Sequence, residues 1–413
     1  MTSRSVPNRQ FRVLLAARVC VWSAGGIAAV ALPLALFQRT GSASLTSALA
    51  AMEVIPYLLV GLLAGAVADR LRTRTVATTA CVLCAVASGS VALAALLGGL
   101  TVTHLFAAAF GVGTALVFFD AAMFAALPAI VSRERLSVAF ASMTAVQTVI
   151  ALVAPTTGGF LSGLITPERT LLVNTALLFV GAGVFVILRE PERIRGDGSS
   201  GILADIREGL RFVAGHRLIR ALTALGVGNS INQGIVTGLL VATVVTVHRM
   251  PDNGPHVGIA YSALAVGALI GSRAISAFQR RAQLRVVTTT GLVLAAAGLA
   301  VWSQQPNYVV GLVGLTIYQI GTTTVILNGI TQRARVTPDN LQGRVNTTAR
   351  MFSWGGQPLG AIGGAVLVPV LQIQPTYLLA IGILLLTAAI AVRVLRPSAI
   401  ETPAPTDAQV ALD

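Results

Sequence analysis

The side chains best suited to chemistry are ionisable groups that lie inside long apolar stretches. Glu53 falls about nine residues into one such stretch, and Asp120 and Arg18 fall within two others. An ionisable group in hydrocarbon costs about 2.5 to 3.5 kcal/mol on insertion scales, so each invites a functional interpretation. No basic residue lies at the depth of Glu53. Burial therefore favours its protonated form, which suits a proton carrier; the alternative is a glutamate that faces water or hydrogen-bonds to a neighbour.

A second group of candidates consists of amide and tryptophan side chains embedded in apolar sequence. They are Asn229, Asn232, Gln233, Gln319, Asn328 and Gln357, with the tryptophans Trp22 and Trp354. A single buried amide is usually an interhelical hydrogen bond, and a buried tryptophan usually packs. The alternative is a substrate cavity in which amides bind and tryptophans stack on a planar ligand. A mostly apolar cavity of this kind suits an amphipathic or lipophilic molecule better than a sugar or a polyanion.

Enzymatic and metal chemistry find no support in the sequence. The chain has four histidines but no HExxH motif, no P-loop and no clustered carboxylates. Cys20, Cys81 and Cys84 all lie in apolar segments, so we interpret the CxxC spacing as packing rather than as a redox or zinc site. The sequence therefore predicts no enzyme, no bound metal and no cofactor.

The elements that must position these side chains are apolar blocks long enough to cross a bilayer. Hydrophobic residues make up 55% of the 413 residues, and charged residues 11%. Crossing a hydrocarbon core takes about 20 residues, and segmentation by hydropathy predicts twelve spans. Their expected ranges are 12–38, 44–68, 75–98, 102–127, 136–164, 169–188, 218–247, 256–279, 285–303, 307–331, 344–372 and 374–395.

The positions of the arginines predict the orientation of these spans. All 29 basic residues are arginines. Most lie in short loops on the side of the N-terminus, whereas the loops of the other side hold only Arg39, Arg169 and Arg249. This asymmetry predicts cytoplasmic termini and a multi-pass protein of the inner membrane. The formal charge of +14 does not indicate nucleic-acid binding, because the basic residues do not cluster between aromatic side chains.

A polar interruption at 189–217 divides the spans into two sets of six. We expect residues 1–188 and 218–396 to form two pseudo-symmetric six-helix bundles in an all-α membrane protein. The linker between them contains 202–213, which is predicted to be an amphipathic helix on the cytoplasmic surface. The tail, 397–413, is predicted to be disordered.

An internal repeat supports this division. Val131, Glu134, Leu136, Gly158 and Gly159 correspond in order to Val336, Asp339, Leu341, Gly363 and Gly364. Likewise, Gly61 and Gly65 correspond to Gly267 and Gly271. Two parallel halves related about the membrane normal suit alternating access around a site at the midplane.

The loop between the second and third spans carries the most specific motif. Residues 61–74 read Gly-Leu-Leu-Ala-Gly-Ala-Val-Ala-Asp-Arg-Leu-Arg-Thr-Arg, which resembles the GxxxDRxxR-type loop of the major facilitator superfamily. The resemblance implies a transporter in which the glycines admit a neighbouring helix and the acid contacts the eleventh helix, holding the cytoplasmic side shut. A solvated basic loop is the alternative. The residues assigned to this gating loop are Gly61, Gly65, Asp69, Arg70 and Arg74.

The fifth span carries an element associated with export in the same family. Ala154-Pro155-Thr-Thr-Gly158-Gly159-Phe-Leu-Ser-Gly163 is similar to the family's GPxxGG element, with alanine in place of the first glycine. A proline can kink a membrane helix, and small residues permit packing tight enough to limit leak. The alternative is a generic packing seam.

Three further segments resemble the branch that contains macrolide-efflux and enterobactin-exporter-like proteins. They are Phe11-Arg12 with Arg18 and 31–33, then 206–213, and finally 336–345. The first and fourth helices line the cavity in this family, so Arg18 and Asp120 are expected to pair. An ionised, paired Asp120 would act in structure or gating rather than as a lone proton carrier. The chain departs from the branch at 23–26 and at Asp120 itself.

These observations together predict a secondary transporter of major facilitator fold. We expect it to export a small amphipathic or lipophilic organic molecule by proton antiport and alternating access, as a monomer in the lipid bilayer. Glu53 and Asp120 are the candidates for proton coupling. The alternatives are an importer or lipid-like substrate transporter of the same fold, and a membrane sensor or scaffold that does not transport.

Overall fold

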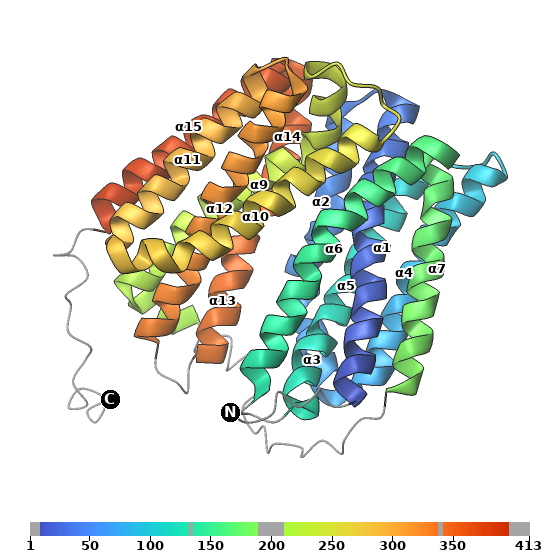
Figure 1. Cartoon of the computed structure of the whole chain (residues 1–413), viewed down its shortest axis with the longest axis horizontal. Coiled ribbons are helices and arrows are strands. Elements are labelled where there is room, and N and C mark those ends of the chain that lie inside the picture. The colour runs from blue at the N-terminus through green and yellow to red at the C-terminus, as the bar shows by residue number, and fades with distance from the viewer. Residues whose placement is uncertain (1–8, 132–134, 189–209, 338–341, 396–413) are drawn as a thin grey trace, which may run out of the picture.

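The computed structural model describes residues 9–131, 135–188, 210–337 and 342–395 (Figure 1). Over these ranges the chain consists of helices and short connections. Most of the predicted linker helix and all of the predicted tail lie outside the described residues.

The first half contains seven helical segments. They are α1 (Arg9–Thr40), α2 (Ala43–Leu59), α3 (Gly61–Arg70), α4 (Thr73–Leu96), α5 (Val102–Ile130), α6 (Leu136–Ile165) and α7 (Pro167–Ile187). The second half has the same general plan. Its segments are α9 (Arg217–Ala242), the π-helical turn η2 (Thr243–Val247), α10 (Pro255–Arg281), α11 (Leu284–Gln304), α12 (Tyr308–Val336), α13 (Gln342–Trp354), α14 (Gly356–Leu371) and α15 (Ile373–Val394).

Each of the twelve predicted spans is present as helix, and two of them are divided. Among the described residues, eleven helices are long and apolar enough to cross a membrane, and α2 is an apolar helix of 17 residues. The second span breaks between α2 and α3 at Val60, whose φ of −117° and ψ of 1° leave the helical region. The eleventh breaks between α13 and α14 at Gly355, within a glycine pair of low helix propensity.

The helices form two bundles with matching packing schemes (Figure 1). In the first bundle α1 packs on α6 and α7, α4 on α5 and α7, and α2 on α5. In the second bundle α9 packs on α14 and α15, α11 on α12 and α15, and α10 on α12. Each of these contacts has its counterpart in the other half. The apolar side chains buried within each bundle form its core.

The bundles meet mainly through two helix pairs, α6 with α10 and α2 with α14. We call the face at which α1 begins and α15 ends the terminal face, and the opposite face the distal face. On the distal side, Ser44 and Ser47 of α2 donate hydrogen bonds to the carbonyl oxygens of Ala365 and Ala361, over 2.5 and 2.8 Å. Toward the terminal face the bundles diverge (Figure 1), and α3 packs chiefly on α5 of its own bundle.

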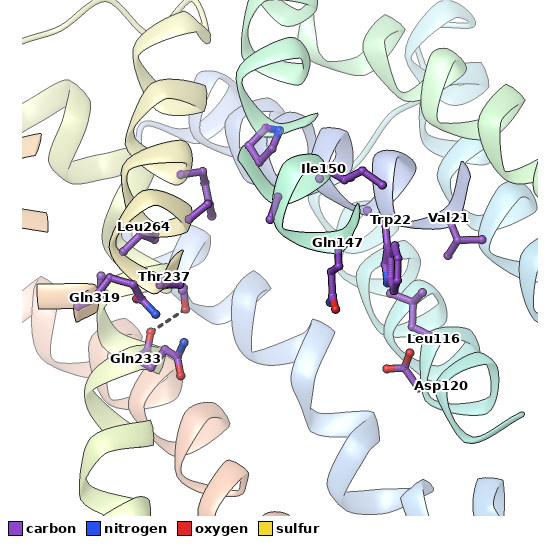
Figure 2. Close-up of a pocket in the computed structure, with 18 of the residues that line it drawn as sticks. Val21, Trp22, Leu116, Asp120, Gln147, Ile150, Gln233, Thr237, Leu264 and Gln319 are labelled. Carbon is purple, nitrogen blue, oxygen red and sulfur yellow. Dashed lines mark hydrogen bonds between the residues drawn. The ribbon is translucent and has the colours of Figure 1, made fainter. Parts of the chain in front are cut away.

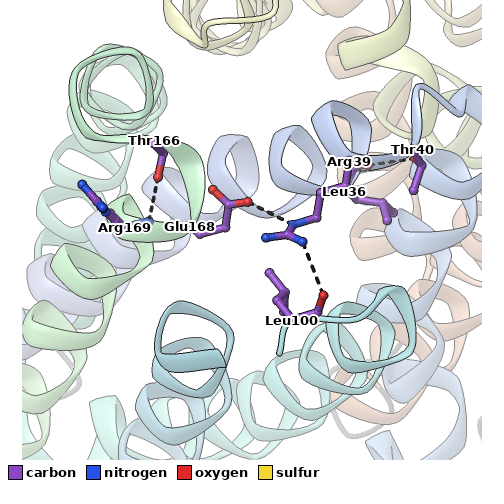
Figure 3. A network of polar contacts seen from close by, with 7 residues as sticks. All are labelled: Leu36, Arg39, Thr40, Leu100, Thr166, Glu168 and Arg169. Atoms are coloured by element: carbon purple, nitrogen blue, oxygen red, sulfur yellow. Dashed lines mark hydrogen bonds and ion pairs between the residues drawn. The ribbon is translucent and has the colours of Figure 1, made fainter. Parts of the chain in front are cut away.

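Hydrogen bonds at the distal face fix the ends of the first-bundle helices (Figure 3). Arg39 at the end of α1 forms an ion pair with Glu168 of α7 at 3.1 Å and donates to the carbonyl oxygen of Leu100 before α5. Thr166 and Thr101 cap α7 and α5 through their hydroxyl groups. One arginine therefore links three helix ends, while caps satisfy the free backbone N–H groups.

A histidine packed among aromatic rings lies at the distal end of the second bundle. His248 follows η2 and is 2% exposed. Its ring centroid lies 4.4 Å from that of Trp302 and 5.8 Å from that of Tyr308. Burial lowers the pKa of His248, against a smaller opposing effect of the backbone carbonyls of Pro306 and Trp302.

This pKa shift predicts a loss of stability in acid. In the unfolded chain the pKa of a histidine is about 6.5, which is higher than the pKa of His248 in the folded protein. As the pH falls through about 6.5, the unfolded chain therefore binds more protons than the folded protein does. Stabilisation present at higher pH is then lost. We expect the melting temperature of the purified protein to fall from about pH 7.5 to about pH 5.5, and to fall less in His248→Phe. Equal pH dependence in both proteins would rule out His248 as the cause.

Candidate functional site

A cavity of about 500 Å³ lies between the two bundles (Figure 2). It is bounded by α1, α2, α5 and α6 of the first bundle and by α9, α10 and α12 of the second. The lining is mostly apolar or aromatic. The aromatic and polar side chains in it are Trp22, Tyr57, Phe119, Asp120, Gln147, Gln233, Thr237, Tyr261, Tyr318 and Gln319.

The first-bundle wall contains a charged group held by several neighbours. The hydroxyl of Tyr57 donates to Oδ2 of Asp120 over 2.9 Å. Arg18 lies one turn before Trp22 on α1, and its guanidinium carbon is 5.1 Å from the centre of the indole ring. Arg18 also interacts electrostatically with Asp120. The predicted partners are thus neighbours, and their functional pairing stays a prediction.

The second-bundle wall is formed by uncharged polar and aromatic groups. Gln233 and Thr237 lie one turn apart on α9, and the Thr237 hydroxyl donates to the Gln233 carbonyl oxygen over 2.8 Å (Figure 2). The amide nitrogen of Gln319 donates to the Thr323 hydroxyl over 3.3 Å. Tyr261 and Tyr318 complete this wall.

Glu53 lies at the junction of the bundles rather than among the residues that line the cavity. Its backbone is in close contact with α5, because a Cβ atom on Gly113 would collide with the Glu53 carbonyl group. The Glu53 side chain interacts electrostatically with Tyr261 of α10, in the other bundle. Glu53 is therefore positioned where a relative movement of the bundles changes its surroundings.

Two glycines of α6, Gly159 and Gly163, form the distal seam between the bundles, and Gly158 packs on α1 of its own bundle. A Cβ atom on Gly158 would lie 2.8 Å from Cα of Ile27, and one on Gly163 would lie 2.8 Å from the Asn253 carbonyl oxygen. Gly159 faces the backbone of Gly254 and Gly258. Pro155, one turn earlier, borders the cavity. The export-like element thus packs backbone against backbone at the distal side.

In this conformation no neighbouring helix packs against the glycines of the gating loop. Nothing lies within 4 Å of a Cβ atom built on Gly61 or Gly65, so the predicted close approach of a neighbouring helix is absent from this conformation and stays a prediction for another. The reason is the divergence of the bundles toward the terminal face. Arg70 and Arg74 are exposed, and the side chain of Asp69 lies outside the described residues.

Only part of the predicted cavity set lines the cavity. Trp22, Gln233 and Gln319 do so, as does Asp120. The other predicted members are Asn229, Asn232, Asn328, Trp354 and Gln357, none of which belongs to the lining among the described residues.

The predicted lining residues that do not reach the cavity lie in other parts of the second bundle. Asn229, Asn232 and Asn328 are fully buried within the second bundle. Asn328 accepts from Gln279 and donates to Thr288, each over 2.9 Å, so it connects α10, α11 and α12. Trp354 is 45% exposed at the end of α13. For these positions the expectation of cavity lining is wrong, and for Asn328 the interhelical hydrogen bond is the correct interpretation.

Several residues that line the cavity were not predicted from the sequence. Tyr57 lies one turn after Glu53 on α2, a spacing that a search for polar groups on the same helix face finds. Gln147 is a lone amide in an apolar helix, the same signal that singled out Gln233. Tyr261 and Tyr318 carry no such signal, because a tyrosine in an apolar block is usually a packing residue. Among the described residues, no cluster of metal-ligating side chains is present.

Comparison with known proteins agrees with this architecture. The sequence profile of the Major Facilitator Superfamily matches residues 14–360. The multidrug efflux pump Tap of Mycolicibacterium fortuitum is 26% identical over 387 residues, covering 89% of this chain and 91% of its own length. The enterobactin exporter EntS of Shigella boydii is 26% identical over 400 residues, covering 93% and 92%.

Solved structures of transporters have the same fold. The nucleoside transporter NupG superposes with a TM-score of 0.73 at 15% identity, covering 94% of this chain and 98% of its own. An inward-facing, unoccupied bacterial homologue of the lysosomal transporter Spinster superposes with a TM-score of 0.75 at 14% identity, covering 97% and 100%. The fold, the cavity between the bundles and the profile match agree. The chain belongs to the major facilitator superfamily and is a multi-pass secondary transporter of small molecules, not an enzyme.

Proposed function

We propose that the protein exports a small amphipathic or lipophilic organic molecule by alternating access. The observation that carries this proposal is the cavity between the bundles, whose lining combines aromatic and amide side chains with a single carboxylate among the described residues. Such a lining suits a mostly apolar ligand held by a few polar contacts. The names of the relatives, a multidrug efflux pump and an enterobactin exporter, favour export over import.

The proposed orientation places the terminal face in the cytoplasm and the protein in the inner membrane. Exposed arginines of the α3–α4 connection and of the end of α10 lie at this face, in accord with the excess of positive charge in cytoplasmic loops. The distal seam then closes the outer side, and the conformation is inward-facing. When the cytoplasmic side closes, we expect the loop 61–74 to meet the eleventh helix. Both bundles belong to one chain, so we expect a monomer.

The proposed coupling ion is the proton, and Glu53 is its proposed carrier. A carrier must meet different surroundings in the two states, and Glu53 lies where α2 faces Tyr261 of the other bundle. Asp120 receives a hydrogen bond from Tyr57 and lies beside Arg18. These contacts favour a fixed charge at Asp120 and leave proton exchange to Glu53.

Replacement of Glu53 by glutamine tests export and coupling together. Glutamine cannot release a proton, so we expect Glu53→Gln to lose the efflux that depends on the proton gradient. The measurement is dye efflux from cells that express either protein, with ethidium, a lipophilic macrolide and the uncharged dye Nile red as probes. Each probe is followed with and without a protonophore.

The matched control is Glu168→Gln, the same chemical change at a distal ion pair far from the cavity. It should transport like the wild type. Protonophore-sensitive efflux that persists in Glu53→Gln would exclude Glu53 as the carrier. Wild-type cells that accumulate a probe against its gradient, or that expel none of the panel, would contradict export of this substrate class.

A further inference from the structure

Among the described residues, the cavity lining contains one charged side chain, and a basic group lies near it. Asp120 is the only ionisable carboxylate or basic group among the described residues that line the cavity. It accepts a hydrogen bond from Tyr57 and interacts electrostatically with Arg18. Arg18 in turn lies against the face of Trp22, which borders the cavity. The carboxylate and the guanidinium together present a first-bundle wall with no net charge.

The amide groups that line the cavity come from three different helices. Gln147 of α6, Gln233 of α9 and Gln319 of α12 line the same cavity from both bundles. In Figure 2, Gln147 extends toward the space between Trp22 on one side and Gln233 with Gln319 on the other. Each primary amide has two N–H donors and a carbonyl acceptor. The amides can therefore satisfy donors and acceptors at different edges of an uncharged ligand.

Aromatic rings lie on both sides of these amides. Trp22, Tyr57 and Phe119 belong to the first bundle, and Tyr261 and Tyr318 to the second. Aromatic side chains provide large contact areas and prefer stacked or edge-to-face contact with other rings. A flat aromatic body of a few fused rings suits walls of this kind and a volume of about 500 Å³.

We propose that the cavity selects an uncharged, flat aromatic molecule with an N–H donor and a carbonyl acceptor on its ring system, such as a fused-ring pyridone, and disfavours permanent organic cations. This inference rests on the proposed function, since it names the substrate class of the same site. A cation that leaves water for this cavity meets one lining carboxylate, Asp120, which already interacts with Tyr57 and Arg18 and so does little to offset the lost hydration of the cation. A neutral pyridone exchanges its hydrogen bonds with water for hydrogen bonds to the amides.

The test compares two tricyclic probes of nearly equal size, neutral acridone and cationic 10-methylacridinium. Binding is measured by fluorescence with the purified full-length protein in nanodiscs, and the signal of empty nanodiscs is subtracted. We expect the wild type to bind acridone at least about tenfold more tightly, a difference of about 1.4 kcal/mol. Gln233→Leu and Gln319→Leu should each weaken acridone binding several-fold and leave 10-methylacridinium unchanged.

A variant that changes the charge beside the cavity tests the same proposal, because it should shift the binding preference toward the cation. Arg18→Gln removes the positive partner of Asp120, so we expect it to gain affinity for 10-methylacridinium and reverse the preference. The control is Gln305→Leu, a change of the same kind at an exposed position outside the cavity, which should bind both probes like the wild type.

Binding separates this inference from the proposed function, because it does not depend on direction or coupling. The proposed substrate class would be overturned if the wild type binds 10-methylacridinium as tightly as acridone or more tightly. It would also be overturned if neither glutamine substitution changes the affinity for acridone. The proposed substrate class would also be overturned if the wild-type protein transports other probes but does not bind acridone. Selective acridone binding by a protein that exports nothing would support the substrate class and count against export.

Discussion

Gly159→Leu is expected to abolish export by preventing closure of the distal face. A Cβ atom at Gly159 would collide with the carbonyl oxygen of Gly254 and lie 3.1 Å from Cα of Gly258. These neighbours are backbone atoms, which cannot turn aside as a flexible side chain can. Overpacking costs about 1 to 3 kcal/mol, and a penalty of that size confined to the closed state shifts the conformational equilibrium about 5- to 150-fold. The protein should therefore remain open to the outside.

Two measurements check this result. Efflux should be lost, and a cysteine placed in the cavity by Thr237→Cys should react with a membrane-impermeant maleimide from outside the cell in Gly159→Leu but not in the parent. Of the native cysteines, Cys81 and Cys84 are buried and Cys20 is partly exposed, so the proteins without Thr237→Cys, with and without Gly159→Leu, measure the background. Gly183→Leu is the matched control, because nothing lies within 4 Å of a Cβ atom there. Normal efflux by well-expressed Gly159→Leu would show that the distal seam does not need to close this tightly.

Most of the fold follows from local sequence. Apolar blocks about as long as the bilayer is thick appear as helices near their predicted bounds, because a membrane segment must satisfy its own backbone hydrogen bonds. The breaks at Val60 and Gly355 were not predictable in this way. Leu58 packs against Gly355, at 3.1 Å from a Cβ atom built there. The breaks therefore lie where the second and eleventh helices meet, a contact between residues far apart in the chain.

The site was predicted less completely than the fold, because sequence gives a helix face but not the depth to which neighbouring helices cover it. Asn229 and Gln233 lie one turn apart on one face of α9, yet only Gln233 reaches the cavity. Asn328 carries the same signal as Gln319 but is enclosed by α10 and α11. Residue type and helical period do not distinguish the lining amides from the enclosed ones, because the helices that enclose Asn229 and Asn328 are far away in the sequence.

Charge reversal at Arg18 and Asp120 is expected to recover part of the transport that either single change removes. Arg18→Asp leaves two acids together, and Asp120→Arg leaves two bases together, in a half-buried setting. Loss of one partner leaves the other charge unmatched, which costs more than removing both. We expect each single variant to lose about 10- to 100-fold in efflux rate, or about 1.4 to 2.8 kcal/mol.

The double variant Arg18→Asp with Asp120→Arg restores the charge balance but not the detailed contacts. Tyr57 would then face a guanidinium instead of the carboxylate to which it donates, and Trp22 would lose the cation packed on its ring. Recovery should therefore be partial, with a coupling energy above about 1 kcal/mol in the double-mutant cycle. The coupling energy is calculated from efflux rates corrected for the amount of each variant in the membrane. Losses that simply add would mean that the two groups act independently, and an independent Asp120 would present an unmatched negative charge to the cavity and favour cationic substrates.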